Sequence, residues 1–139
     1  MAVLPAKPLK THHAALKVTD FDKSLNFYTE GLGMKLLKTW GEEDSRAAMF
    51  DIGDGTCIEM FAGGIKGELS QDRAGSFIHF AFDVEDPDSW YERALSCGAT
   101  SKSAPADLLV ETSADPLDVR IAFVYGPDGE VLEFFHSKR

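Results

Sequence analysis

Two histidines and two glutamates stand at matching places in two similar stretches of the chain. His13 lies in HHAALKVTDFD, and His79 lies 66 positions later in HFAFDVEDPD. Glu59 lies in DGTCIEMF, and Glu133 lies 74 positions later in DGEVLEFF. The pairs that match at the offset of 66 are His13 and His79, Ala15 and Ala81, Val18 and Val84, Asp20 and Asp86, and Asp22 and Asp88. The chain therefore repeats one unit, with about eight extra residues in the second copy.

Two neutral imidazoles and two carboxylates make a mixed nitrogen and oxygen ligand set. Such a set suits a divalent metal, with Ni²⁺, Co²⁺ or Zn²⁺ favoured and Mn²⁺ or Fe²⁺ also compatible. A metal of this kind polarises a carbonyl and stabilises an enediolate, and a carboxylate beside it can remove the neighbouring proton. We therefore predict a metal site at His13, Glu59, His79 and Glu133.

A lone histidine or glutamate on a strand is more often structural than a ligand. The equivalent positions of these four residues in the repeat favour a shared site over four separate structural roles. His12 and His136 fall outside the pattern, and we interpret them as surface or packing residues. Cys57 and Cys97 form no CxxC pair, so they are interpreted as buried thiols rather than a zinc or redox motif.

The periodicity of apolar residues predicts one strand, one helix and three strands in each unit. Asp20 and Asp86 are expected to cap the two helices, with Pro87 at the first helical position. We expect an α+β fold: two βαβββ modules form a paired, cup-shaped, eight-stranded mixed sheet with helices outside and the four ligands on its inner lining. The expected elements are strands 11–19, 33–40, 46–52 and 56–62 around a helix at 21–30, then strands 76–84, 100–103, 118–126 and 130–136 around a helix at 87–97, with an irregular excursion at 104–117.

The 139 residues fit one domain, with module one at about 11–62, a linker at 63–75 and module two at about 76–137. The net charge of −9 argues against nucleic-acid binding, which needs a basic face. No apolar run approaches a membrane span and the first ten residues lack the apolar region of a signal peptide, so a cytoplasmic location is expected.

Several residues are candidates for contact with a small-molecule substrate. Phe61 and Phe135 share the faces of Glu59 and Glu133 and would make the cup partly dry, which strengthens electrostatic effects there. Arg73, in the glycine-rich linker, can reach an anionic substrate, although a solvated loop is the plainer interpretation.

The sequence resembles the vicinal oxygen chelate superfamily, which includes glyoxalase I, methylmalonyl-CoA epimerase, extradiol dioxygenases and antibiotic-resistance proteins. HHAALKVTDFDKSLNFYTEGLGMKLLKT is similar to the first strand, helix and second strand of that family, and FVYGPDGEVLEFF is similar to its terminal hairpin. The resemblance covers residues 11–137. It implies the paired βαβββ fold, a small-molecule substrate and a cup built within one chain or across a homodimer; we expect a homodimer.

The resemblance also ranks the possible activities. Glyoxalase I uses His, Glu, His and Glu in the order found here, whereas the epimerases usually carry Gln at the second position and the dioxygenases use two His and one Glu. It thus implies a metal-dependent lyase or isomerase of the glyoxalase I type, with Glu133 as the base and Glu59 as the other candidate. The alternatives are an epimerase, an Fe²⁺ extradiol dioxygenase, or a non-catalytic binding protein of the resistance type.

Two positions depart from the glyoxalase I pattern. That family usually carries an arginine on the first strand that helps to hold the glutathione carboxylates, and this chain has Lys17. It often carries an asparagine shortly after the second ligand, and this chain has Gly63. Lysine does not replace arginine at a bidentate site. The metal ligands match the family, and the glutathione-binding positions do not.

Overall fold

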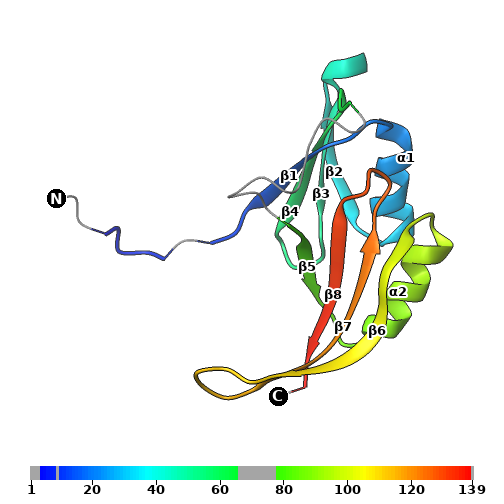
Figure 1. Cartoon of the computed structure of the whole chain (residues 1–139). Helices are drawn as coiled ribbons and strands as arrows, with labels where there is room; N and C mark the ends of the chain where they lie inside the picture. Colours follow the sequence, from blue (N-terminus) through cyan, green and yellow to red (C-terminus); the bar gives the residue numbers. More distant parts are fainter. Residues whose placement is uncertain (1–3, 9, 66–77, 139) are drawn as a thin grey trace.

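Two βαβββ modules make up the computed structural model, which describes residues 4–8, 10–65 and 78–138 (Figure 1). The modules predicted from the internal repeat are confirmed. Module one contains β1 (His13–Lys17), α1 (Phe21–Asn26), a π-helical turn (Phe27–Gly31), β2 (Lys35–Trp40), a 3₁₀ turn (Glu43–Ser45), β3 (Ala47–Asp51) and β4 (Cys57–Phe61). Module two contains β5 (Phe80–Asp83), α2 (Pro87–Ser96), β6 (Thr100–Val110), β7 (Leu117–Tyr125) and β8 (Val131–Ser137).

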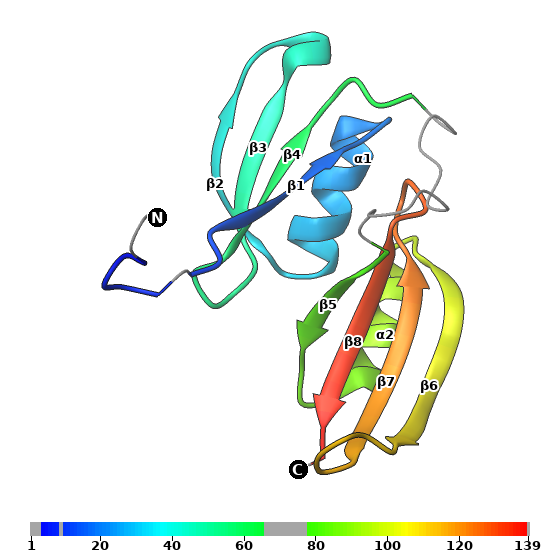
Figure 2. The same cartoon turned by 60° about the vertical axis from the view of Figure 1, so that its left-hand side comes forward.

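Each module folds into its own four-stranded mixed sheet. The strand order is β1-β4-β3-β2 in module one and β5-β8-β7-β6 in module two. In both, the first strand pairs in parallel with the last, and the remaining neighbours are antiparallel. The eight strands are therefore divided into two hydrogen-bonded sheets, which Figure 2 shows separately.

Both helices lie on the same side of the two sheets (Figure 1). Their apolar residues join the inward residues of the central strands in one hydrophobic cluster that spans both modules. The largest fully buried side chains in it include Tyr28, Phe50 and Phe134. Burial of this apolar surface drives the packing, and it leaves the opposite face of each sheet free for the candidate ligands.

The predicted helix caps are confirmed. The carboxylate of Asp20 accepts a hydrogen bond from the backbone N–H of Lys23, and that of Asp86 accepts one from Ser89, with Pro87 at the start of the helix. These bonds satisfy N–H groups that a helix leaves unpaired at its start.

Our prediction for the extra residues of module two is wrong. β6 does not stop near residue 103 but continues to Val110, and β7 begins at Leu117, so the expected excursion is a long hairpin. Figure 1 shows this hairpin reaching past the ends of the other strands. Pro105 had argued against a strand, because proline lacks the N–H that a central strand needs. β6 is an edge strand, however, and its register shifts between Ser103 and Ala106, where a proline can be accommodated.

The start of the second module also differs from our expectation. β5 begins at Phe80, so His79 lies immediately before the strand rather than inside it. Ile78, the residue before His79, is exposed. Residues 66–77, which include most of the predicted linker, lie outside the described residues. None of the helices in the described segments is long and apolar enough to cross a membrane.

Hydrogen bonds on the helical side tie module one to module two. The buried hydroxyl of Tyr28 donates to Glu130 over 2.6 Å, and burial raises the pKa of Tyr28 well above its usual value. Thr19 donates to the carboxylate of Asp128, and the guanidinium of Arg93 donates to two carbonyl oxygens in the turn after α1. The relative position of the modules is thus set by polar contacts as well as by the shared core.

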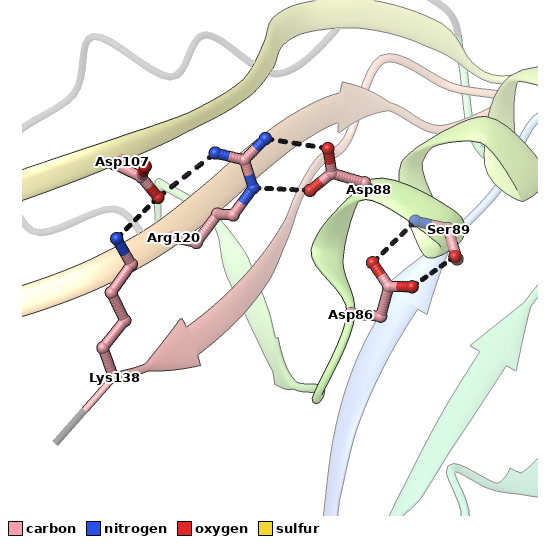
Figure 3. Close-up of polar contacts among 6 residues, drawn as sticks. All are labelled: Asp86, Asp88, Ser89, Asp107, Arg120 and Lys138. Carbon is pink, nitrogen blue, oxygen red and sulfur yellow. Dashed lines mark hydrogen bonds and ion pairs between the residues drawn. The ribbon is translucent and has the colours of Figure 1, made fainter.

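A charged network anchors the base of the long hairpin (Figure 3). Arg120 on β7 donates two hydrogen bonds to Asp88 on α2, at 2.6 and 2.8 Å, and a third to Asp107 on β6 at 3.1 Å. Lys138 lies 2.8 Å from the same Asp107 oxygen. Bidentate guanidinium–carboxylate pairing of this kind fixes the relative orientation of the two side chains in addition to their electrostatic attraction.

We expect Arg120→Gln to lower the stability of the protein near neutral pH and much less in acid. The hydrogen bond from Arg120 lowers the pKa of Asp88 below its usual 3.8. A lowered folded-state pKa contributes stability that is present above 3.8 and is lost as pH falls through the folded value. Thermal melts of both proteins across the acid range measure the difference.

Arg93→Gln is the matched control, because Arg93 donates to carbonyl oxygens rather than to carboxylates. Its effect on melting temperature should stay constant over the range in which the Arg120→Gln effect shrinks. An Arg120→Gln effect that is equally large well below pH 3.8 would contradict the role of Asp88.

Candidate metal site

The first predicted pair, His13 and Glu59, lies on the face of module one that is turned away from α1. The Nε2 atom of His13 is 3.7 Å from the Oε1 atom of Glu59, and the two side chains are 38% and 20% exposed. His13 is the first residue of β1, and Glu59 is the central residue of β4. The structure thus brings together two residues that are 46 positions apart in the sequence.

The second pair, His79 and Glu133, repeats this arrangement in module two. The Nε2 atom of His79 is 3.3 Å from Oε1 of Glu133, and the side chains are 36% and 10% exposed. The imidazole also packs edge-on against Phe123, with the ring centroids 5.6 Å apart. Because Phe123 stands opposite Glu133 in the β7–β8 ladder, the aromatic ring borders both members of the pair.

The strand register explains why the two pairs look alike. Glu59 stands opposite Ala15, and Glu133 stands opposite Ala81. Each histidine lies two residues before the alanine, so it reaches its glutamate diagonally across a parallel strand pair. The small alanine side chain at the opposed position leaves space beside the carboxylate.

The two carboxylates differ in their contact with water. Glu133, counted as a whole residue, is 7% exposed, and the residues on either side of it in β8 are buried as well. Burial raises the pKa of Glu133, and the neighbouring His79 acts in the opposite direction. Glu59 is only partly buried. The module-two half of the site is therefore the drier one.

The separations within each pair fit two donor atoms on one metal ion. With metal–ligand bonds of about 2.1 Å, two donors on one ion lie roughly 3–3.5 Å apart. The observed 3.3 Å lies within this range and 3.7 Å lies slightly beyond it. However, no group of three or more metal-binding side chains comes together among the described residues of one chain. The structure brings the four predicted ligands together as two pairs and does not bring the pairs together.

A cavity of about 510 Å³ lies between the first strands of the two modules. His13 and His79 both line it, together with Ala15 on β1 and Val131 on β8. It adjoins the histidine of each pair and is large enough for a small molecule to enter. The remaining lining residues are Ala14, Leu16, Ile78, Phe80, Glu130 and Leu132.

The other residues predicted to contact a substrate lie in different parts of the structure. Lys17 and Phe61 stand opposite each other in the β1–β4 ladder and line one hollow beyond Glu59. Phe135 is two residues past Glu133 and is partly buried. Arg73 lies outside the described residues.

The two departures from the glyoxalase I pattern are spatial neighbours. A side-chain Cβ at Gly63 would lie 3.7 Å from Cε of Lys17 and 3.1 Å from the carbonyl oxygen of Asp44. Gly63 also has φ near +86°, which disfavours other residues. An asparagine at this position would therefore be strained, and the lysine occupies the adjoining space.

His12, which we interpreted as a surface or packing residue, contacts the site. Its Nδ1 atom is 2.9 Å from Nδ1 of His13, so one ring donates a hydrogen bond to the other. When His13 is the donor, its Nε2 keeps the lone pair that a metal requires. The adjacency of His12 to His13 was the only sequence signal, and strand alternation pointed away from it. His136 is a packing residue as predicted, with Nδ1 3.1 Å from the carbonyl oxygen of Val84.

Comparison with known proteins shows a family match over nearly the whole chain. Residues 10–134 match the model of the glyoxalase/bleomycin resistance protein/dioxygenase superfamily. A probable lactoylglutathione lyase of Vibrio parahaemolyticus is 30% identical over 135 residues, covering 91% of this chain and 90% of the relative. The lactoylglutathione lyase of Salmonella typhimurium is also 30% identical, with 91% of each chain covered. An uncharacterized Bacillus subtilis protein, YraH, reaches the same identity over 91% of this chain and 98% of its own.

Solved structures show the same fold at lower identity. A domain from Frankia sp. of the same superfamily superposes with a TM-score of 0.75 at 23% identity, covering 95% of this chain and all of that one. A glyoxalase I variant from Zea mays superposes with a TM-score of 0.66 at 24% identity, covering 91% of this chain and 44% of that one. At these identities the likeness concerns the fold alone.

We expect His12→Ala to weaken metal binding about 10- to 100-fold, the usual effect of removing a residue that orients a ligand. The metal dissociation constant, measured by competition with a chromophoric chelator, tests this. His136→Ala is the matched control, since His136 contacts Val84 rather than a candidate ligand, and it should leave the constant unchanged. Equal effects of the two substitutions would contradict an orienting role for His12.

Proposed function

The chain belongs to the glyoxalase/bleomycin resistance protein/dioxygenase superfamily, and on this premise we propose that it is a metal-dependent lyase or isomerase of the glyoxalase I type. The observation that carries the proposal is the pair of equivalent His–Glu contacts, His13 with Glu59 and His79 with Glu133. Relatives that are 30% identical carry the name lactoylglutathione lyase, which supports the same class of reaction.

His13, Glu59, His79 and Glu133 would hold a divalent ion, with Ni²⁺, Co²⁺ or Zn²⁺ favoured. When bound, the ion supplies Lewis-acid polarisation of a substrate carbonyl. Glu133, once it no longer holds the ion, would be the base that removes the proton beside that carbonyl and returns it to the neighbouring carbon. Its 7% exposure favours this role, because a carboxylate with little water around it exchanges protons with substrate rather than with solvent. Glu59, which is more exposed, is the other candidate.

The neighbouring positions Lys17 and Gly63 favour a substrate other than the glutathione hemithioacetal. A single ammonium group next to a glycine cannot reproduce the two-pronged binding of a carboxylate. An anionic substrate with one acidic group near Lys17 suits this arrangement.

An epimerase acting on such a substrate is the second candidate. It would incorporate solvent deuterium into the substrate without rearrangement. Oxygen consumption with catechols would instead indicate dioxygenase chemistry.

We propose further that the active form is a homodimer. One chain presents its ligands as two separate pairs, and a four-ligand site requires the open face of a module one to meet the open face of a module two. Large apolar side chains also remain exposed on β2 and on the β6–β7 hairpin, where a second copy can cover them. They are Leu36, Leu37, Trp40, Leu108, Leu109, Val110 and Leu117.

We expect Glu133→Gln to keep most of the bound metal while turnover falls by about 10²–10⁴-fold, the usual contribution of a general base. Metal content by elemental analysis and turnover of a panel of hemithioacetals and acyl-CoA esters measure the two effects. His79→Ala is the control that should lose both metal and turnover. Unchanged turnover in Glu133→Gln would remove Glu133 from this role, and native protein without metal after supply of Ni²⁺, Zn²⁺ or Fe²⁺ would overturn the proposal.

Co-expression of two defective chains tests the dimer. His13→Ala removes a candidate ligand from module one, and His79→Ala removes one from module two. Each of these variants expressed alone should therefore bind little metal. If a site joins module one of one copy to module two of the other, each mixed dimer has one intact site. Random pairing then restores about a quarter of the native metal content.

Co-expression of His13→Ala with Glu59→Ala is the matched control. Both changes lie in module one, so no intact site can form and no metal should be recovered. A monomer in sedimentation experiments would overturn the homodimer. A dimer without recovery in the first mixture would show that the site closes within one chain.

A further inference from the structure

The two His–Glu pairs share their strand register but differ in exposure. The side chain of Glu59 is 20% exposed and that of Glu133 is 10% exposed, and the nitrogen–oxygen distance is 3.7 Å in module one and 3.3 Å in module two. The residues on either side of the two glutamates do not explain this difference, because all four are at most 2% exposed and point to the opposite face of the sheet. They are Ile58, Met60, Leu132 and Phe134. The cause therefore lies among the residues that share the open face with the glutamates.

The internal repeat allows these open-face neighbours to be compared one by one. Across the parallel strand pair, both glutamates face an alanine. Two positions before each glutamate stands a small buried residue, Cys57 at 6% and Val131 at 7% exposure, and two positions after it stands a partly buried phenylalanine. Across the antiparallel pair, the glutamate of module one faces Met49 and that of module two faces Phe123. The change from methionine to phenylalanine is the largest difference among these neighbours.

Phe123 borders both members of the pair in module two. Its ring packs edge-on against the imidazole of His79, with the centroids 5.6 Å apart and the planes inclined by 73°. The same residue stands opposite Glu133 in the β7–β8 ladder. A phenyl ring is rigid and favours such edge-to-face packing, whereas a methionine side chain has three rotatable bonds and adapts to its surroundings. Phe123 can therefore fix the direction of the imidazole and cover the carboxylate more firmly than Met49 can in module one.

The two histidines are held in different ways. His13 is part of β1, and its ring is hydrogen-bonded to that of His12. The residue before His79 is Ile78, which has no polar side-chain atom and is exposed. His79 also lies outside β5, so the strand ladder does not orient it. Packing against Phe123 takes the place of the hydrogen bond that orients the other histidine.

We propose that Phe123 is the positioning residue that assigns proton transfer to module two. It holds the His79 ring at Glu133 and keeps water away from that carboxylate. Met49, at the equivalent place, leaves Glu59 more hydrated and suited to holding the metal. This inference rests on the proposed lyase or isomerase activity, and it adds the residue that decides which glutamate is the base.

The division of roles follows from what a base must do in this reaction. It takes the proton from the carbon beside the carbonyl and returns it to the neighbouring carbon, so no proton is gained or lost overall. A carboxylate in contact with water exchanges that proton with solvent, whereas a carboxylate covered by an aromatic ring retains it for the return step. Restricting His79 at the same time keeps the imidazole beside Glu133 during the transfer.

NMR spectra of the metal-free protein test the contact independently of any activity. An aromatic ring shifts the resonances of protons that lie close to it. We expect Phe123→Met to move the imidazole resonances of His79, identified by their loss in His79→Ala, and to leave those of His13 in place. Tyr125→Met is the matched control, because Tyr125 is a partly buried aromatic residue two positions further along β7 whose ring faces Lys102. It should move the His79 resonances much less.

Turnover of hemithioacetals and acyl-CoA esters tests the role in the reaction. Phe123→Met should lower turnover about 10- to 100-fold with metal still bound, the usual effect of removing a residue that orients a ligand. In D₂O, the product formed by this variant should carry a larger fraction of solvent deuterium than the product of the native protein. Phe123→Tyr keeps the ring and should restore both values. A residue needed only for stability would leave the deuterium fraction unchanged.

Exchange of the two residues between the modules tests the assignment of the base. In the native background, Glu133→Gln should lower turnover about tenfold more than Glu59→Gln does. In the double variant Met49→Phe/Phe123→Met, the aromatic ring stands opposite Glu59 instead. The order of the two glutamine substitutions should then be reversed.

Three results would overturn the inference. They are His79 resonances that are the same in Phe123→Met and the native protein, lost turnover that Phe123→Tyr does not restore, and an unchanged order of the two glutamates after the exchange. Should the exchanged protein fail to fold, the single Phe123 variants decide. A native protein without metal or turnover overturns the proposed activity together with the assignment of the base. Intact metal binding and turnover with any of the three results overturns this inference alone.

Discussion

Parallel pairing of the first and last strand of each module is the constraint on which the rest of the structure depends. Parallel strands cannot be joined by a tight turn and need a long crossover connection. Here the helix and the two middle strands are that connection, between β1 and β4 and again between β5 and β8. The pairing brings a histidine at the start of a module next to a glutamate at its end, and the crossover sends the helix to the other face.

The helical side of the sheets consequently holds the modules together, and the open side carries the His–Glu pairs. On the helical side the two modules share one hydrophobic cluster and are joined by the Tyr28–Glu130 hydrogen bond. On the open side each module keeps its own His–Glu pair. The residues of the two pairs are therefore not needed for the packing that holds the modules together. The four proposed ligands can be polar because they contribute little to the core.

The repeat made most of the fold predictable from the sequence, along with the two pairs. A match at one offset fixes equivalent strands, helices and caps at once, which is why Asp20 and Asp86 were both identified correctly. Features without a counterpart in the other module were not predictable in this way. The long β6–β7 hairpin occurs only in module two, and Pro105 argued locally against a strand that an edge position and a register shift allow. His12 has no equivalent beside His79, so the repeat gave no reason to assign it to the site.

The way in which the two pairs could meet follows from the same division of faces. A metal site of four ligands needs two open faces, and each chain supplies one of each kind. The contacts between its own modules lie on the helical side and leave both open faces accessible. In the proposed homodimer, two copies related by a twofold axis would satisfy both faces of both chains with a single kind of contact, because such an interface is self-complementary. The unequal burial of Glu133 and Glu59 then has a chemical consequence. Each complete site would combine the drier pair of one chain with the wetter pair of its partner. One carboxylate would be suited to proton transfer and the other to holding the metal.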